Sequence, residues 1–90
     1  MSTVHARIEG RVQGVFFRDS TRRQAEKLNL TGWVQNMADG SVEAVFQGKI
    51  ENVEAMKTWL GDGSPQADVS RVEIQQLDGE QQFSEFQIRY

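Results

Sequence analysis

Residues 4–18 decide the fold, and they read VHARIEGRVQGVFFR. In the first half of this stretch the apolar residues Val4, Ala6 and Ile8 alternate with polar ones. A period of two is typical of a strand that buries one face, because successive side chains of a strand point to opposite sides of the sheet. Gly10 interrupts the alternation, so the first strand is expected to end there.

An amphipathic helix is predicted directly after the turn that follows this strand. Its buried stripe, at spacings of four, four and three, is Phe17, Thr21, Ala25 and Leu28. Charged residues occupy the other faces, as a helix with one apolar stripe requires. The chain therefore passes from strand to helix through a short turn that contains glycine.

Two further strands and a tight turn are predicted from the middle of the chain. The strands are residues 31–36, which include Trp33 and Val34, and residues 41–47, where Val42, Ala44 and Phe46 share one face. Asp39-Gly40 lies between them and indicates a hairpin, because glycine supplies the positive φ that a tight turn needs. These two strands are expected to pair with each other.

A second helix is predicted after this hairpin. Its apolar stripe is Ile50, Val53, Met56 and Leu60. Glu51 or Asn52 stands near its start, and Gly61 and Gly63 are candidate stops, since glycine is favoured just past the end of a helix.

Two strands are predicted to complete the sheet. The first contains the apolar residues Val69, Val72, Ile74 and Leu77. The second runs over residues 83–90, where Phe86, Ile88 and Tyr90 alternate with polar residues. The order βαββαβ plus a terminal strand predicts an α+β fold of the ferredoxin-like kind. Such a fold is a two-layer sandwich with two helices on one face of a largely antiparallel sheet.

Length and composition narrow the classes of protein. Ninety residues predict a single domain over residues 1–90. The chain has no cysteine, which excludes a disulfide scaffold, a thiolate metal site and a cysteine nucleophile. Its net charge of −3 gives no general attraction to nucleic acid or to an anionic membrane, so neither is an expected partner. With no signal-like segment and no long apolar run, the expected location is cytoplasmic.

Residues 10–18 are the strongest candidate for a binding site. The first turn of a helix carries unpaired N–H groups and the positive end of the helix dipole, so a glycine-containing turn there can wrap its amides around an anion. Arg18 adds a planar fork of donors that matches two phosphoryl oxygens. Val12, Val15, Phe16 and Phe17 are expected to limit the access of water.

The residues alone leave another interpretation of this stretch open. A glycine turn that leads into a helix beginning with arginine is also an ordinary structural feature. A nucleotide site is not indicated, because the run is neither G-x-G-x-x-G nor a P-loop.

Three motifs give the chain a family resemblance. GRVQGVFFR at 10–18, TGWVQN at 31–36 and DGSVE at 39–43 closely resemble the acylphosphatase family, and the similarity continues in the same order to FQIRY at 86–90. The resemblance implies hydrolysis of acyl phosphates, which are mixed anhydrides of a carboxylic acid and phosphate, without a metal or another cofactor.

The resemblance also implies a division of roles among site residues. The phosphoryl group would be held by the Arg18 guanidinium and by a loop of backbone amides. That loop comprises Gln13, Gly14, Val15, Phe16, Phe17 and Arg18. The side-chain amide of Asn36 would orient the attacking water. Several family members carry threonine after this asparagine, whereas this chain has Met37, so water positioning is expected to depend more fully on Asn36.

The resemblance sets expectations about partners. A small-molecule acyl phosphate is the expected substrate, inorganic phosphate or other anions are the expected product-like ligands, and a monomer is the expected state. The alternative is a non-catalytic module that binds an acyl phosphate or another anion, since acylphosphatase-like domains occur inside larger proteins that process carbamoyl phosphate. An RNA-binding module ranks last, because residues 42–47 lack the basic and aromatic pattern that such sheets present.

The remaining conspicuous residues are interpreted structurally. His5 is expected at the surface, and no metal site is predicted. Arg22, Arg23 and Lys27 are expected on a solvated helix face, with at most a minor role in steering an anionic substrate. The residues expected in the core are Trp33, Phe46, Met56, Trp59, Phe83 and Phe86.

Overall fold

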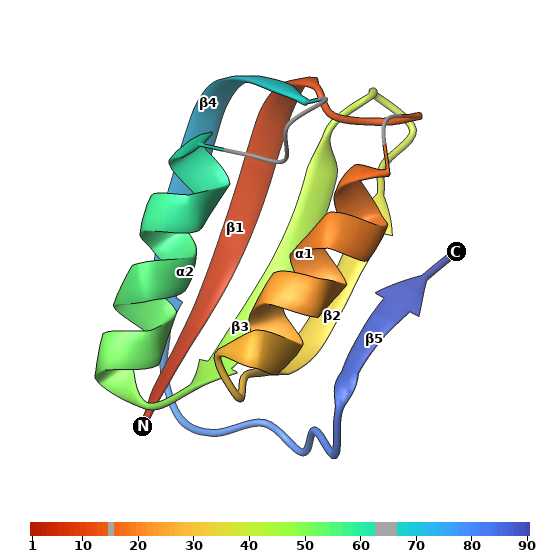
Figure 1. Cartoon of the computed structure of the whole chain (residues 1–90). Helices are drawn as coiled ribbons and strands as arrows, with labels where there is room; N and C mark the ends of the chain where they lie inside the picture. The colour runs from red at the N-terminus through yellow and green to blue at the C-terminus, as the bar shows by residue number, and fades with distance from the viewer. Residues whose placement is uncertain (15, 63–66) are drawn as a thin grey trace.

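The predicted order of elements is confirmed by a computed structural model that describes residues 1–14, 16–62 and 67–90 (Figure 1). The strands are β1 (Ser2–Arg11), β2 (Thr31–Asn36), β3 (Val42–Gly48), β4 (Asp68–Leu77) and β5 (Phe86–Arg89), and the helices are α1 (Phe17–Lys27) and α2 (Ile50–Asp62). Gly61 lies within α2 and does not stop it, and Gly63 falls outside the described residues. The last strand starts at Phe86, three residues later than the alternation predicts.

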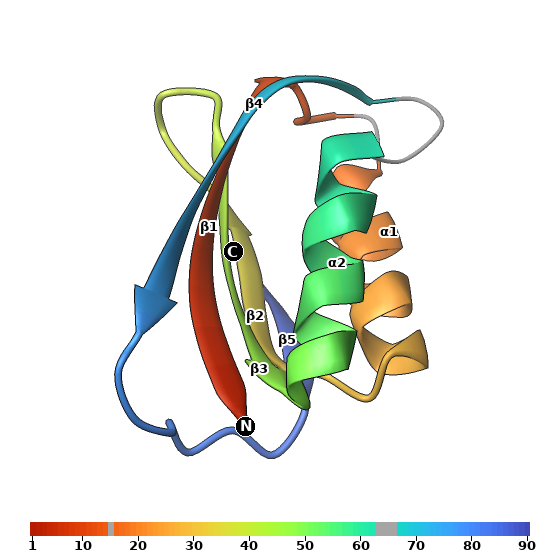
Figure 2. The same ribbon diagram turned by 90° about the vertical axis from the view of Figure 1, so that its left-hand side faces the viewer.

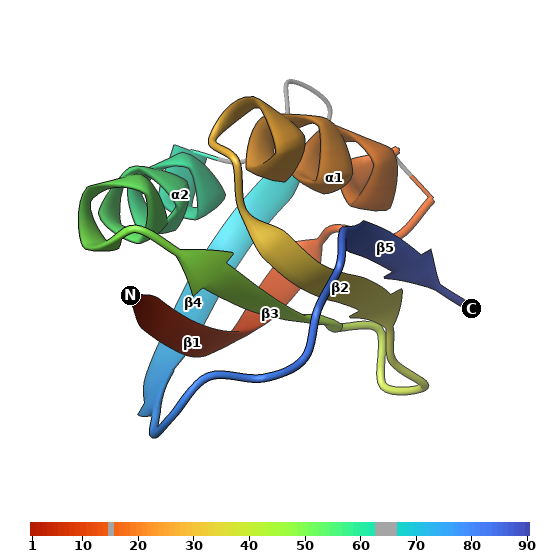
Figure 3. The ribbon, with the colours of Figure 1, turned by 90° about the horizontal axis from the view of Figure 1, so that it is seen from below.

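The five strands form one sheet in the order β4-β1-β3-β2-β5. All neighbours pair antiparallel except β2 and β5, which pair parallel. This exception arises because the chain leaves β4 at one edge of the sheet and crosses the end of the sheet to reach the other edge (Figure 3). The sheet is therefore largely antiparallel, as predicted.

A buried glutamine fastens this crossing segment to the sheet. The hydroxyl of Thr3 donates a hydrogen bond of 2.7 Å to Oε1 of Gln47. The same Oε1 accepts a bond of 2.8 Å from the backbone N–H of Gln81, and Nε2 of Gln47 donates at 3.0 Å to the Gln81 carbonyl. Gln47 thus fixes the segment at a point five residues before β5 begins.

Both helices cover the same face of the sheet, which makes the predicted two-layer sandwich (Figure 2). Helix α1 packs on β2 and β5, whereas α2 packs on β1, β3 and β4. Among the described residues no helix is both long and apolar enough to cross a membrane.

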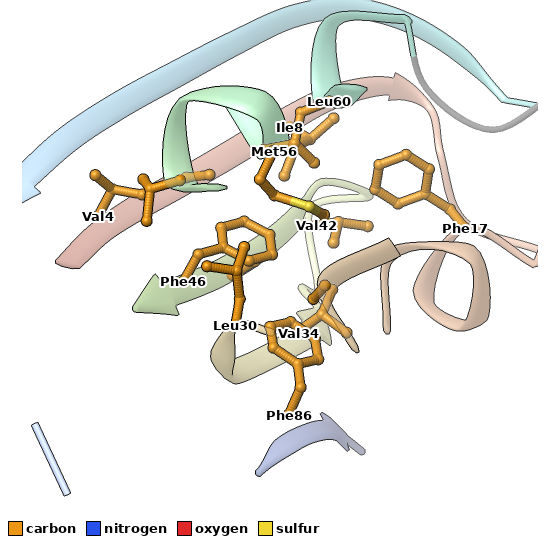
Figure 4. Close-up of a cluster of buried hydrophobic side chains, with 14 of the residues drawn as sticks. Val4, Ile8, Phe17, Leu30, Val34, Val42, Phe46, Met56, Leu60 and Phe86 are labelled. Carbon is orange, nitrogen blue, oxygen red and sulfur yellow. The ribbon is translucent and has the colours of Figure 1, made fainter. Parts of the chain in front are cut away.

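The core lies between these two layers (Figure 4). Its members are the inward-facing strand residues and the apolar helix stripes, including Val4, Ile8, Phe17, Val34, Phe46, Val53, Met56, Leu60 and Phe86. Ile50 is an exception, since it is 60% exposed although the helical spacing predicts it in the stripe. Ile50 is the first residue of α2, and side chains of a helix point toward its N-terminus, so this side chain projects beyond the packed layer.

The aromatic residues divide between the core and the helix-free face of the sheet. Phe46 and Phe86 stack in the core with ring centroids 5.4 Å apart, while Trp59 and Phe83 are only half-buried. The prediction for Trp33 is wrong, because Gly32 and Val34 face the helices and strand alternation turns Trp33 to the opposite side.

His5 also lies on the helix-free face and is not a free surface residue. Its side chain is 28% exposed, and its Nε2 lies 2.9 Å from Oε1 of Glu43. The imidazole meets the Trp33 ring edge-on at 6.4 Å between centroids. This cluster is separated from the helix layer by the sheet itself.

A β-bulge explains the irregular apolar spacing in β4. Val69 and Val72 are three residues apart, yet both pack against the core. The pairing with β1 shifts between Glu9, which faces Arg71, and Gly10, which faces Val69. The extra residue on β4 restores the alternation, and a side chain at Gly10 would collide with the backbone of Asp68.

Candidate functional site

The direction of the strands brings three chain segments to the same end of the sheet. β1 and β2 both run antiparallel to β3, so they are parallel to each other, and β5 runs parallel to β2. The loop after β1, the hairpin after β2 and the C-terminal end of β5 therefore lie at the same end of the sheet, where α1 also begins (Figure 1).

The described part of the loop between β1 and α1 has left-handed backbone at two positions. Gly14 has φ +74° and Phe16 has φ 60°, so both lie in the left-handed region. For a residue other than glycine this region is unfavourable by roughly 1–2 kcal/mol, and such strain is concentrated at functional sites. Phe16 is the N-cap of α1, and its side chain makes no capping hydrogen bond. Within the part of the chain that the structure describes, the first amides of α1 thus have no side-chain acceptor.

Gln13 ties this loop to the β2–β3 hairpin. Its Nε2 donates two hydrogen bonds of 2.8 Å, one to the Met37 carbonyl and one to the Ser41 carbonyl. The side chain therefore points to the hairpin, and Gln13 is not among the residues that line the pocket described next.

A pocket of about 410 Å³ opens where the three segments meet. The described residues that line it are Val12, Gly14, Phe16, Phe17, Arg18, Asp19, Arg22, Asn36, Ile88 and Tyr90. The structure thus brings Arg18 and Asn36, which lie 18 positions apart in the sequence, onto the walls of one pocket. Val15 falls outside the described residues. The rings of Phe16 and Phe17 do not both shield the pocket from water as expected. Phe17 is buried in the core, and Phe16 is 75% exposed.

The end of β5 holds the Arg18 side chain. Nη1 of Arg18 donates a long hydrogen bond of 3.4 Å to the Arg89 carbonyl. The guanidinium carbon lies 4.8 Å from the centre of the Tyr90 ring, in cation–π range. These contacts place the guanidinium beside the end of β5, and its other donors have no partner among the described residues.

Asn36 presents an unsatisfied acceptor at the same place. It is the last residue of β2, and its Oδ1 is buried with no hydrogen-bond partner among the described residues. A buried amide oxygen is normally hydrogen-bonded, because leaving it unpaired is unfavourable by about 1–3 kcal/mol. Asn36 is therefore a polar residue of the pocket wall whose side chain is not satisfied by the residues packed around it.

The turn that follows Asn36 is braced by an aspartate. Oδ1 of Asp39 accepts hydrogen bonds from the Ser41 hydroxyl at 2.6 Å and from the Ser41 N–H at 2.9 Å, and Oδ2 accepts from Arg7 at 2.5 Å. The two bonds from Ser41, with the Arg7 guanidinium, hold the pKa of Asp39 far below its usual range. The hairpin is thereby held rigid between Asn36 and the strand that follows.

Sequence reasoning missed four residues of the pocket wall. Asp19 and Arg22 were detectable, because Arg22 is four positions after Arg18 and a helix places such residues on one face. Ile88 and Tyr90 had no local signal, since their position depends on the parallel pairing of β5. Among the described residues, no three His, Asp or Glu side chains come together as metal ligands would.

Comparison with known proteins gives one consistent result. The model of the acylphosphatase family matches residues 4–88. An acylphosphatase from Thiobacillus denitrificans is 55% identical over 80 residues, which is 89% of this chain and 90% of that protein.

Two solved acylphosphatases have the same structure. The one from Coxiella burnetii superposes with a TM-score of 0.92 at 43% identity, over 98% of this chain and 92% of that one. The one from Bacillus subtilis gives 0.96 at 31% identity over the whole of both chains. The family expected from the three motifs is thus confirmed by sequence and by structure. The chain belongs to the acylphosphatase family, the enzymes (EC 3.6.1.7) that hydrolyse small-molecule acyl phosphates to a carboxylate and inorganic phosphate.

Proposed function

We propose that Arg18 and the amides of residues 13–18 bind the phosphoryl group of the acyl phosphate, and that Asn36 positions the water that attacks it. One observation carries this assignment: Arg18 and Asn36, whose Oδ1 is unpaired among the described residues, line the same pocket beside the uncapped start of α1.

Electrostatics supports the assignment of the phosphoryl position. Free N–H groups and the dipole of α1 favour a negative group at the start of the helix. Arg18 adds charge-assisted hydrogen bonds, which are about twice as strong as neutral ones. The chain as a whole carries a net charge of −3, so attraction of a dianionic phosphoryl group depends on this local arrangement.

The chemistry needs little beyond positioning. A water molecule that donates to Asn36 Oδ1 turns a lone pair away from that oxygen and toward the phosphorus. The leaving group is a carboxylate of low basicity, so departure needs no strong acid. The water oxygen forms the new bond to phosphorus as the bond between phosphorus and the bridging oxygen breaks. The bridging oxygen leaves with the acyl group, which gives a carboxylate and inorganic phosphate. Positioning and charge stabilisation account for catalysis of this kind.

The proton of the attacking water passes to an oxygen of the phosphoryl group itself in this mechanism. Asn36 cannot act as a base. Asp19 is the one side-chain carboxylate among the described pocket residues, and it pairs with Arg22 at 3.2 Å and Arg23 at 3.0 Å. His5 lies on the other side of the sheet from the helices.

The experiment that tests this proposal is hydrolysis of benzoyl phosphate in excess EDTA by the wild type, Arg18→Ala and Asn36→Ala. We expect Arg18→Ala to lower kcat/KM about 30- to 4,000-fold and to lose most phosphate affinity, because a paired charge is worth about 2–5 kcal/mol. Asn36→Ala should lower kcat by about 10²- to 10³-fold with phosphate affinity kept.

Two results would overturn these roles. Normal phosphate binding by Arg18→Ala would remove Arg18 from the site, and weakened binding with intact kcat in Asn36→Ala would refute the water-positioning role. Saturable phosphate binding by the wild type without turnover would favour the non-catalytic binding module.

The proposal extends to the form in which the protein works. We propose that residues 1–90 act as one domain and as a monomer, with inorganic phosphate as a product-like ligand. The family match over residues 4–88 supports the single domain. Light scattering should give a mass near 10.2 kDa, and a multiple of it would contradict the monomer. Cell fractionation tests the cytoplasmic location expected from the sequence.

A further inference from the structure

The pocket contains a second arginine besides the one assigned to the phosphoryl group. Arg18 and Arg22 are four residues apart on α1, so they share a helix face and are separated by about 6 Å along the helix axis. Both line the pocket, together with Ile88 and Tyr90 from the end of the chain. A volume of about 410 Å³ falls within the range of small-molecule sites and leaves room for an acyl group beside the phosphoryl group.

Arg22 is only partly paired within the described residues. Its Nη2 donates to Oδ1 of Asp19 at 3.2 Å, whereas its Nε is buried and has no partner there. A buried donor on a charged group is unfavourable unless an acceptor reaches it. Because Nε is closed to solvent, a ligand in the pocket meets the remainder of the Arg22 side chain, which is 41% exposed and carries the positive charge.

The start of α1 also carries more positive charge than the single arginine assigned to the phosphoryl group. The first two turns of α1 carry three arginines and one aspartate, a net charge of +2 in a chain of net charge −3. Asp19 is shared between Arg22 and Arg23, so it does not neutralise both. Once the phosphoryl group occupies Arg18, Arg22 still presents positive charge to the pocket.

We propose that Arg22 is a specificity-determining residue that selects acyl phosphates whose acyl part carries a second anionic group, such as a carboxylate. The inference rests on the proposed phosphoryl site at Arg18. An uncharged acyl group gains nothing from the charge of Arg22. A carboxylate on the acyl part is attracted by the exposed part of the Arg22 guanidinium while the phosphoryl group stays at Arg18.

The test compares two substrates that differ by one carboxylate, benzoyl phosphate and 3-carboxybenzoyl phosphate. The quantity measured is the ratio of their kcat/KM values in the wild type, Arg22→Gln and Arg23→Gln. Arg23 is a matched control, because it also pairs with Asp19 but is 75% exposed and does not line the pocket. We expect Arg22→Gln to lower the ratio about 5- to 30-fold, as for loss of a charge-assisted hydrogen bond in a half-exposed site. Arg23→Gln should leave it within about twofold.

A binding measurement separates this inference from the proposed function. Benzylphosphonate and 3-carboxybenzylphosphonate are not hydrolysed, so the ratio of their affinities reports Arg22 even if turnover is absent. Failure of the wild type to hydrolyse benzoyl phosphate would refute the proposed function, whereas the phosphonate ratio alone decides the role of Arg22. An unchanged ratio in Arg22→Gln, or an equal fall in Arg23→Gln, would overturn the inference.

Discussion

Removal of the Gln13 side chain should slow the chemical step without weakening phosphate binding. In Gln13→Ala the two hydrogen bonds of 2.8 Å from Nε2 to the Met37 and Ser41 carbonyls are lost. Each such bond contributes about 0.5–1.5 kcal/mol net. Because Gln13 is half-exposed and water can replace part of the loss, we expect a total of about 1–2 kcal/mol. The hairpin that carries Asn36 then moves independently of the phosphate loop.

The expected result is a fall in kcat of about 5- to 30-fold, since 1.36 kcal/mol corresponds to a factor of ten. The inhibition constant of phosphate should change less than about twofold, because Arg18 and the loop amides remain. The assay is steady-state hydrolysis of benzoyl phosphate, with urea unfolding of each variant to measure stability.

Gln76→Ala is the matched control for this prediction. Gln76 also donates two hydrogen bonds from Nε2, to the Ser2 hydroxyl and the Thr3 carbonyl, both at 3.1 Å, on a strand remote from the pocket. Because Gln76 is exposed, water replaces more of its bonds, so we expect a smaller loss of stability than in Gln13→Ala and an unchanged kcat. Wild-type kcat in Gln13→Ala, or an equal loss in Gln76→Ala, would refute the idea that Gln13 couples the loop to Asn36.

Three further predictions follow from contacts described above. Arg18→Lys should recover less than about tenfold of the kcat/KM lost in Arg18→Ala, because an ammonium lacks the planar fork; full recovery would show that charge alone suffices. His5→Gln should leave the pH profile of kcat between pH 5 and 8 superimposable on that of the wild type, and a lost inflection would make His5 the proton acceptor. Asp39 has a lowered pKa, so its contribution to stability is present above about pH 4, the usual pKa in the unfolded chain, and is lost as pH falls below it. Urea unfolding should therefore show Asp39→Ala less stable than the wild type at pH 7 and the gap narrowing at pH 3, whereas a constant gap would contradict the role of the carboxylate.

Features that depend on local periodicity were predicted well from the sequence. β1, β2 and α1 have buried faces that repeat every two residues or every three to four, so each segment specifies its own inward side. The error at Trp33 was avoidable by the same rule, because Val34 faces inward and a neighbour in a strand must face outward. Ile50 fails for another local reason, namely its position in the first turn of α2.

Features that depend on distant contacts could not be predicted in this way. The hydrogen bonds of Gln13 span 24 and 28 positions, and nothing near Gln13 indicates their acceptors. Ile88 and Tyr90 reach the pocket only because β5 adds parallel to β2, which no local pattern specifies. Arg18 and Asn36 were identified by resemblance to a family, since the residues alone favoured an ordinary glycine turn over an anion site.

The crossing segment held by Gln47 also determines when the enzyme becomes active as it folds. The bonds between Gln47 and Gln81 join residues 34 positions apart, and β5 pairs with a strand more than 50 positions earlier in the sequence. Contacts between residues so distant along the chain form late, because the entropy lost on closing a long loop must be compensated by neighbours that are already ordered. During folding, β1 to β3 can pair before β5 is in place, but the pocket wall that contains Ile88 and Tyr90 cannot form without β5. Catalytic activity is therefore expected only after β5 has been added to the sheet.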